Sequence, residues 1–126
     1  MKAPWTKSIL KKNREEILFK YKNFYSCHGK LEDKKKLFNL IKSKNPSIII
    51  HLAAQAGVRY SITNPQSYFN SNLEGTFNIL EAAREFKIKH LLMASTSSVY
   101  GSNSDLPFTE SQKTDTQLSF YAASKK

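Results

Sequence analysis

An apolar run, Ile48-Ile49-Ile50, is the feature that most constrains what this chain can fold into. It lies in a predicted strand over 47–53, bounded by Pro46 and by a loop that contains Gly57. A β-branched run of this length favours a strand buried on both faces, as in a parallel sheet. A second apolar segment, over 90–94, predicts a second buried strand.

Segments with helical periodicity alternate with these strands. They cover about 6–22, 32–44 and 66–86, and a further helix begins at Ser119. In the long third segment, apolar residues at spacings of three and four make the helix amphipathic. They are Phe69, Leu73, Phe77, Leu80 and either Ala82 or Ala83. With a short strand expected over 24–27 and a polar loop over 101–118, this succession predicts an α/β fold with a parallel sheet.

The composition excludes several other classes of protein. The chain has 126 residues, of which 40% are hydrophobic and only 4 are Gly and 4 are Pro, so collagen-like and disordered chains are excluded. The single Cys27 rules out an intrachain disulfide and a multi-cysteine zinc site, so we expect no metal and a cytoplasmic location. No apolar run approaches the ~20 residues that span a bilayer, so no membrane association is expected.

The net charge of +10 comes almost entirely from the first third of the chain. Residues 1–44 carry 13 Lys/Arg against 4 Asp/Glu, whereas residues 45–126 carry 7 against 6. Lysines spread along helices usually form a solvated face, so we do not expect a nucleic-acid partner. A basic module that binds an anionic polymer through lysines 2–44 is the alternative from a different functional class.

Two stretches directly follow the predicted strands. Ala53 and Ala54 stand at the carboxyl end of the first strand, where open α/β sheets bind ligands, and small residues let a ligand approach the backbone. The alternative is a tightly packed turn. The hydroxyls of residues 95–98 follow the second strand and could bind a polyhydroxylated ligand or form an ordinary loop.

Two further features involve predicted helices. Tyr121 and Lys125 would share one helix face, where a nearby ammonium favours the phenolate. A general base near neutrality would need a pKa roughly 3 units below the usual ~10, so a bound cationic cofactor would have to contribute. Gly75 in mid-helix costs roughly 1 kcal/mol relative to alanine, which indicates close packing or, less readily, the approach of a ligand.

Four motifs in order resemble the extended short-chain dehydrogenases/reductases, specifically the NAD-dependent sugar-nucleotide epimerase/dehydratase family. They are His51-Leu-Ala-Ala, Asn72-Leu-Glu-Gly-Thr, Ser95-Thr-Ser-Ser-Val-Tyr-Gly and Tyr121-Ala-Ala-Ser-Lys. The fuller form over 51–61 is most similar to the UDP-glucuronate 4-epimerases of that family. The resemblance covers 47–126 and implies a partial Rossmann-like, doubly wound parallel sheet. Residues 1–46 would be a basic helix–strand–helix lead-in, and 47–126 would carry the active-site edge.

The resemblance also implies roles for individual residues. Tyr121 matches the catalytic base, Thr96 the catalytic Ser/Thr, and Lys125 the lysine that binds the nicotinamide ribose and lowers the pKa of the tyrosine. The positions that line NAD are Ala53, Ala54, Asn72 and Lys125. In this family the base removes a proton from the 4-hydroxyl of the sugar while C4 gives a hydride to NAD⁺. The 4-keto sugar then turns and takes the hydride back on its other face.

Ser97 and Ser98 favour an epimerase over other members of the family. The 4,6-dehydratases that it resembles carry Asp-Glu directly after the catalytic Thr, and the decarboxylases usually carry Glu just before Val-Tyr-Gly. Hydroxyl donors at these substrate-binding positions suit a sugar carboxylate. We therefore expect UDP-glucuronate as substrate, with a dehydratase or decarboxylase reaction as the alternative.

Two parts of the family pattern are missing from the sequence. No glycine precedes Gly29, so the Gly-x-x-Gly-x-x-Gly turn that holds the pyrophosphate is absent, and with it the first βαβ unit. The carboxyl-terminal substrate domain is also absent, and Lys30 aligns where an acidic residue often faces the adenine. We therefore expect a fragment that is inactive alone, or a truncated remnant. The family further implies a homodimer through the helices at 66–86 and from 119 onward.

Overall fold

The computed structural model describes residues 8–126, so the first residues of the helix predicted from position 6 lie outside the described residues. The chain begins with α1 (Ser8–Leu18), α2 (Lys34–Lys44) and β1 (Ile48–His51). Between β1 and β2 (His90–Met93) lie α3 (Val58–Thr63), α4 (Pro65–Tyr68), the π-helical turn η2 (Phe69–Glu74) and α5 (Gly75–Glu85). The 3-10 turn η3 (Ser97–Tyr100) and α6 (Phe120–Ala123) follow.

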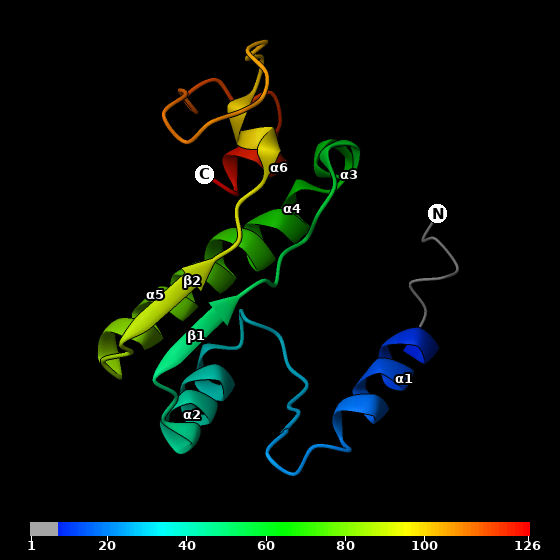
Figure 1. Ribbon diagram of the computed structural model, residues 1–126, viewed down its shortest axis with the longest axis vertical. Helices are drawn as coiled ribbons and strands as arrows, with labels where there is room; N and C mark the ends of the chain where they lie inside the picture. Colours follow the sequence, from blue (N-terminus) through cyan, green and yellow to red (C-terminus); the bar gives the residue numbers. More distant parts are fainter. Residues whose placement is uncertain (1–7) are drawn as a thin grey trace.

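β1 and β2 form a parallel two-stranded sheet, which confirms the predicted α/β class. Ile48 pairs with His90, and the pairing continues residue by residue to His51 with Met93. The crossover between the strands is helical, and its last part, α5, runs along one face of the sheet beside α2 (Figure 1). Because parallel strands end at the same edge, the loops after His51 and Met93 emerge side by side.

The strands are not buried on both faces as predicted. Ile50 is 63% exposed and its neighbour Leu92 is 46% exposed, whereas His51 on the other face is 5% exposed. The helices α2 and α5 contact each other and lie on the same side of the sheet (Figure 1). A strand loses exposure only where another layer covers it, and within residues 8–126 helices cover one face.

The segment 24–27 is not the predicted strand. It follows a turn in which the Phe24 amide donates to the Tyr21 carbonyl, and the Phe24 ring packs edge-on against Phe19. A strand needs a neighbour to complete its ladder of hydrogen bonds, and this extended segment lies apart from the sheet (Figure 1). Glu15 of α1 instead ties it down, because its carboxylate accepts from Ser26 and pairs with His28 at 2.9 Å.

The predicted long helix forms as α4, η2 and α5, but its exposed and buried faces differ from the sequence pattern. The apolar stripe is largely exposed, with Phe77 at 57% and Phe69 at 49%. The buried residues of the helix are Tyr68, Asn72, Gly75, Asn78, Ile79 and Ala82, of which only Ala82 was a candidate member of the predicted stripe. Amphipathic periodicity identified the helix, but the strongest apolar stripe is not the one that packs against the rest of the chain.

Close packing accounts for Gly75 within this helix. A Cβ atom at Gly75 would lie 2.8 Å from Cβ of Leu31, in the segment before α2. One helical turn later, Asn78 donates its amide to the Leu31 carbonyl at 2.9 Å. The prediction of close packing is confirmed, and the packing partner is this segment.

None of the helices in residues 8–126 is long and apolar enough to cross a membrane.

Candidate active site

The predicted site residues come from three segments that meet beyond the carboxyl ends of β1 and β2. The loop after β1 carries Ala53 and Ala54, the segment after β2 carries 95–98, and α6 carries Tyr121. α6 contacts η3, α3 and α4, although it lies far from them in sequence (Figure 1). The fold therefore gathers these segments at the edge where open α/β sheets bind ligands.

Asn72 is the buried centre of this edge. It is 2% exposed, and its Oδ1 accepts from the Gln55 amide at 2.7 Å. Its Nδ2 donates to the Gln55 carbonyl at 3.0 Å and to Ser124 Oγ at 2.8 Å. Both amide hydrogens are thus committed to other segments of the chain. Asn72 holds the loop after β1 and the end of α6 together.

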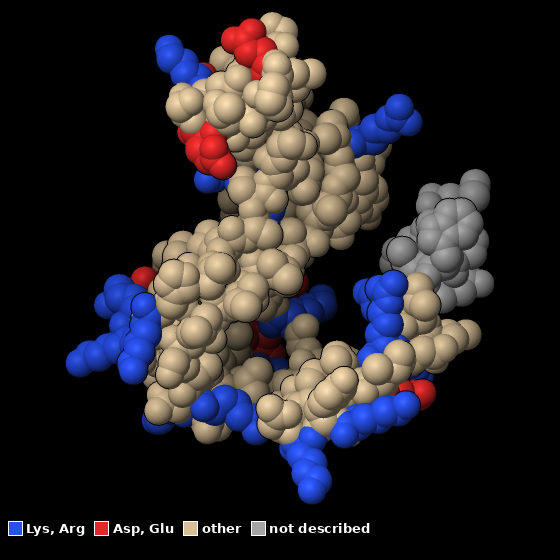
Figure 2. Space-filling model, in the orientation of Figure 1, with Lys and Arg blue, Asp and Glu red and all other residues tan. Residues whose placement is uncertain are grey.

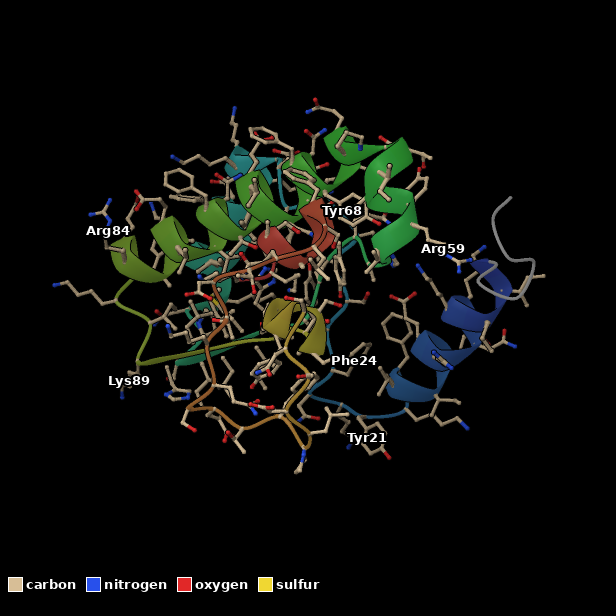
Figure 3. The ribbon with its side chains drawn as sticks, turned by 90° about the horizontal axis from the view of Figure 1, so that it is seen from above. Tyr21, Phe24, Arg59, Tyr68, Arg84 and Lys89 are labelled. Carbon is tan, nitrogen blue, oxygen red and sulfur yellow. The ribbon has the colours of Figure 1, made fainter. Side chains whose placement is uncertain are left out.

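Tyr121 lies in the first turn of α6, and Ser119 is the N-cap of this helix. The Ser119 side chain caps this helix by accepting from the Ala122 amide at 3.1 Å, so the predicted helix start is confirmed. The Tyr121 ring packs edge-on against the ring of Tyr68, with centroids 5.9 Å apart. Tyr68 is fully buried beside α6 (Figure 3), and its hydroxyl donates to the carbonyls of Ala56 and Gly57. Burial raises the pKa of Tyr68, which keeps its hydroxyl a donor.

Lys125 follows α6 rather than belonging to it. The helix ends at Ala123, so the predicted helical face shared by Tyr121 and Lys125 is not formed. Lys125 instead lines a groove of about 330 Å³ together with His51, Thr76 and Met93. Burial lowers the pKa of the Lys125 ammonium. Its carbonyl accepts from Ser95 Oγ at 2.8 Å, which ties the residue to the end of β2.

His51 forms the floor of the same groove at the last position of β1. It is 5% exposed, and its Nε2 lies 3.0 Å from Thr76 Oγ1 of α5. Burial lowers the pKa of His51, and the positive charge of Lys125 lowers it further. Both effects favour the neutral form of the imidazole over the charged form.

The pKa of His51 makes stability depend on pH. Because the native pKa lies below the unfolded value near 6.5, the unfolded chain binds a proton that the native chain does not. We expect the native state to be fully stable above about pH 6.5 and to lose stability as the pH falls. Urea midpoints measured from pH 8 to about pH 5 should fall more steeply for the wild type than for His51→Gln. Parallel curves for the two proteins would contradict this assignment.

The hydroxyl segment after β2 forms a short turn. Thr96 has an extended backbone and caps η3, because its Oγ1 accepts from the Ser98 amide at 3.3 Å. Ser97 is exposed and Ser98 is half-buried, so both hydroxyl groups remain near the surface of the edge. The turn ends at Gly101, with φ of 61°, where a Cβ atom would lie 1.9 Å from the Thr116 carbonyl oxygen.

Three residues of this edge were not identified from sequence: His51, Tyr68 and Ser124. His51 stands inside a recognised motif, and its position at a strand end was an available signal. Ser124 also stands inside the last motif. Tyr68 carries no such signal, since its contacts with Gly57 and Tyr121 are set by the fold.

The comparison with known proteins places this chain in a family. The family model described as GDP-mannose 4,6 dehydratase matches residues 5–126. The chain belongs to the GDP-mannose 4,6-dehydratase family. This membership confirms the resemblance to sugar-nucleotide epimerases and dehydratases that the four motifs carry.

Similar members of the family include proteins named as epimerases. The chain is 45% identical over 124 residues to a protein of Rhizobium meliloti (strain 1021) named as a probable UDP-glucuronate 4-epimerase. It is 44% identical over 117 residues to the UDP-glucuronate 4-epimerase of Thermodesulfobacterium geofontis. These matches cover 98% and 93% of this chain and 36% of each relative. The chain therefore spans about a third of their length.

Solved structures give the same result for the fold. The crystal structure of UDP-glucose 4-epimerase from Bifidobacterium longum, in complex with NAD⁺ and UDP, superposes with a TM-score of 0.82 and 25% identity. The match covers 94% of this chain and 35% of that one. The two-stranded sheet and its helices thus correspond to part of a Rossmann-type family member, as the four motifs implied.

Proposed function

We propose that this chain is the active-site part of an NAD-dependent 4-epimerase that acts on UDP-glucuronate. One observation carries the proposal: the segments that contain Thr96, Tyr121 and Lys125 meet at one edge of the sheet. Hydrogen bonds of Ser95 and Ser124 hold these segments in place. Serines at 97 and 98, where dehydratases of this family would need an acid and a base, support epimerisation over loss of water. The names of the similar proteins support the sugar nucleotide.

The side chains of this edge fit one part of the cofactor. Ala53 and Ala54 are exposed directly after β1, so a flat ring can approach the backbone there. Lys125 offers an ammonium in the neighbouring groove for the ribose hydroxyls. Asn72 would act by supporting the loop, because both of its amide hydrogens are already used. The sequence before Gly29 has no glycine-rich turn for a pyrophosphate.

The proposed chemistry divides between cofactor and chain. Bound NAD⁺ would supply reversible hydride transfer at C4 of the sugar. The Tyr121 hydroxyl group, as phenolate, would take the proton of the 4-hydroxyl and later return it. Thr96 would donate a hydrogen bond to the same oxygen, and Lys125 would stabilise the phenolate. Ser97 and Ser98 would donate to the sugar carboxylate without repelling it.

A chimera tests this function. Residues 5–126 would replace the matching segment of the Thermodesulfobacterium geofontis relative, which supplies the rest of the fold. We expect the chimera to bind NAD⁺ and to interconvert UDP-glucuronate and its C4 epimer, followed by chromatography of the sugar nucleotides. A chimera that folds and binds NAD⁺ but decarboxylates UDP-glucuronate, or that instead converts UDP-glucose to a 4-keto-6-deoxy sugar, would overturn the proposal.

The exposed apolar stripe of the long helix supports a further proposal, self-association. Phe69 and Leu73 of η2 and Phe77 and Leu80 of α5 are between 39% and 57% exposed. Contiguous apolar surface of this kind marks an interface. The helix begun at Ser119 would join it, as in the predicted homodimer.

Introducing a negative charge at the centre of the stripe should therefore yield a monomer. We expect Phe77→Glu to lower the weight-average mass of the chain in sedimentation equilibrium, because a buried carboxylate opposes the interface. Leu106→Glu is the matched control: Leu106 is 74% exposed but lies in the loop over 101–118, outside both predicted interface helices. Equal masses for the wild type and both variants would exclude the helix as the interface.

The structure gives little support to the basic polymer-binding alternative. Lys36 donates to the His28 carbonyl, Lys34 stands over the Phe38 ring and Lys44 over the Tyr25 ring. On the face shown in Figure 2, the basic side chains stand at the periphery over several separate elements. This distribution supports a solvated surface. The exposed free thiol of Cys27 supports the proposed cytoplasmic location.

A further inference from the structure

Ser124 occupies a junction between the long crossover helix and α6. Its Oγ accepts from Asn72 Nδ2 at 2.8 Å and donates to the Tyr121 carbonyl at 2.8 Å. Asn72 in turn holds both backbone groups of Gln55 in the loop after β1. One hydroxyl group thus connects the backbone of Tyr121 to the buried floor of the edge.

Ser43 makes the same local hydrogen bond as Ser124 but receives no bond from a distant residue within residues 8–126, so it serves as a comparison. Its Oγ donates to the Leu40 carbonyl at 2.9 Å, three residues back, as Ser124 does to Tyr121. Ser43 lies on the exposed side of α2, and its bond stays within that helix. The bond from Asn72, which comes from 52 residues away, is therefore what distinguishes Ser124.

Three side-chain hydrogen bonds hold α6 and the residues that follow it: the Ser119 cap, the Ser95 bond to the Lys125 carbonyl and the Asn72–Ser124 bond. Ser124 stands between Tyr121 and Lys125, so it is placed to fix both.

We propose that Ser124 is a positioning residue that holds the Tyr121–Lys125 segment against Asn72. The hydroxyl group sets where the phenol and the ammonium stand relative to the loop after β1. The structural half of this inference stands on the hydrogen bonds alone, and its catalytic consequence rests on the proposed epimerase function.

Amide hydrogen exchange in the 126-residue chain tests the structural half. We expect Ser124→Ala to make the amides of residues 123–125 exchange about fivefold faster, the effect of losing one such hydrogen bond. Ser43→Ala should leave these amides unchanged. In Ser124→Thr, which keeps the hydroxyl group, these amides should exchange as in the wild type. In Ser124→Val, whose side chain has the shape of threonine but no hydroxyl group, they should exchange faster. Equal exchange in the Thr and Val variants would overturn the proposal, even if Ser124→Ala fails to fold.

Kinetics in the chimera test the catalytic consequence. We expect Ser124→Val to lower kcat about tenfold with KM within about twofold, since a displaced base slows chemistry more than binding. The acid-limb pKa of the kcat profile should rise relative to Ser124→Thr, because the ammonium no longer stands in place. If Ser124→Val speeds the exchange of these amides but leaves the pH profile of kcat unchanged, the positioning role is overturned. A chimera inactive even with Ser124 intact would overturn the epimerase proposal instead, and exchange would still decide the structural half.

Discussion

Replacing Tyr121 by phenylalanine should lower the turnover of UDP-glucuronate by at least ~10²-fold in the chimera, the low end of what a general base contributes. The substitution removes only the hydroxyl group that would carry the proton. The ring stays, and with it the edge-on contact to Tyr68 at 5.9 Å. The thermal midpoint should therefore change little. Steady-state kinetics and circular dichroism on the same preparation measure both quantities.

Two further variants separate a catalytic role from a structural one. Tyr21→Phe makes the same chemical change at a position that is 63% exposed and distant from α6 (Figure 3), so it should retain full turnover. Thr96→Ala should cost less than Tyr121→Phe, because it removes one hydrogen bond to the reacting oxygen and leaves the base. Near wild-type turnover in a folded Tyr121→Phe chimera would leave Tyr121 with a packing role only.

Replacing Asn72 by alanine should destabilise the 126-residue chain by about 2–4 kcal/mol, because it leaves two backbone groups of the half-buried Gln55 without their partner. It also removes the bond to Ser124. Urea denaturation would measure the change in the free energy of unfolding.

Asn70→Ala is the matched control for this substitution. Asn70 lies in the same π-helical turn, but its Oδ1 accepts only a surface hydrogen bond from Gln66. We expect a change within about 0.5 kcal/mol, as for most surface substitutions. Similar losses for the two variants would show that the turn, rather than the Asn72 amide, supplies the stability.

Local signals were sufficient for the elements that depend on local chemistry. The run at Ile48–Ile50 identified β1, Asn45-Pro46 marked the end of α2, and Ser119 marked the start of α6. Asn45 caps α2 in the left-handed conformation, which an asparagine tolerates well. Each of these features is decided by residues within a few positions of one another.

Features that depend on contacts between residues far apart in the sequence could not be predicted in the same way. Phe24–Cys27 has the composition of a strand but pairs with no other strand in residues 8–126. The stripe through Phe77 predicted the helix but not which face would pack. Asn72 was recognised as a motif residue, yet its partners lie 17 and 52 residues away, and only the fold brings them together.

The π-helical turn at Phe69–Glu74 decides which face of α5 packs against the rest of the chain. An α-helix rotates ~100° per residue, and a π-turn holds one residue more than the α-helical turn it replaces. If the same residues formed an α-helical turn, α5 would be turned by ~100° relative to α4. Ile79 and Ala82 would then leave the interior while Tyr68 stayed in place. Deleting one residue from 69–74 would instead convert the π-turn into an α-helical one and keep these three side chains on the buried face.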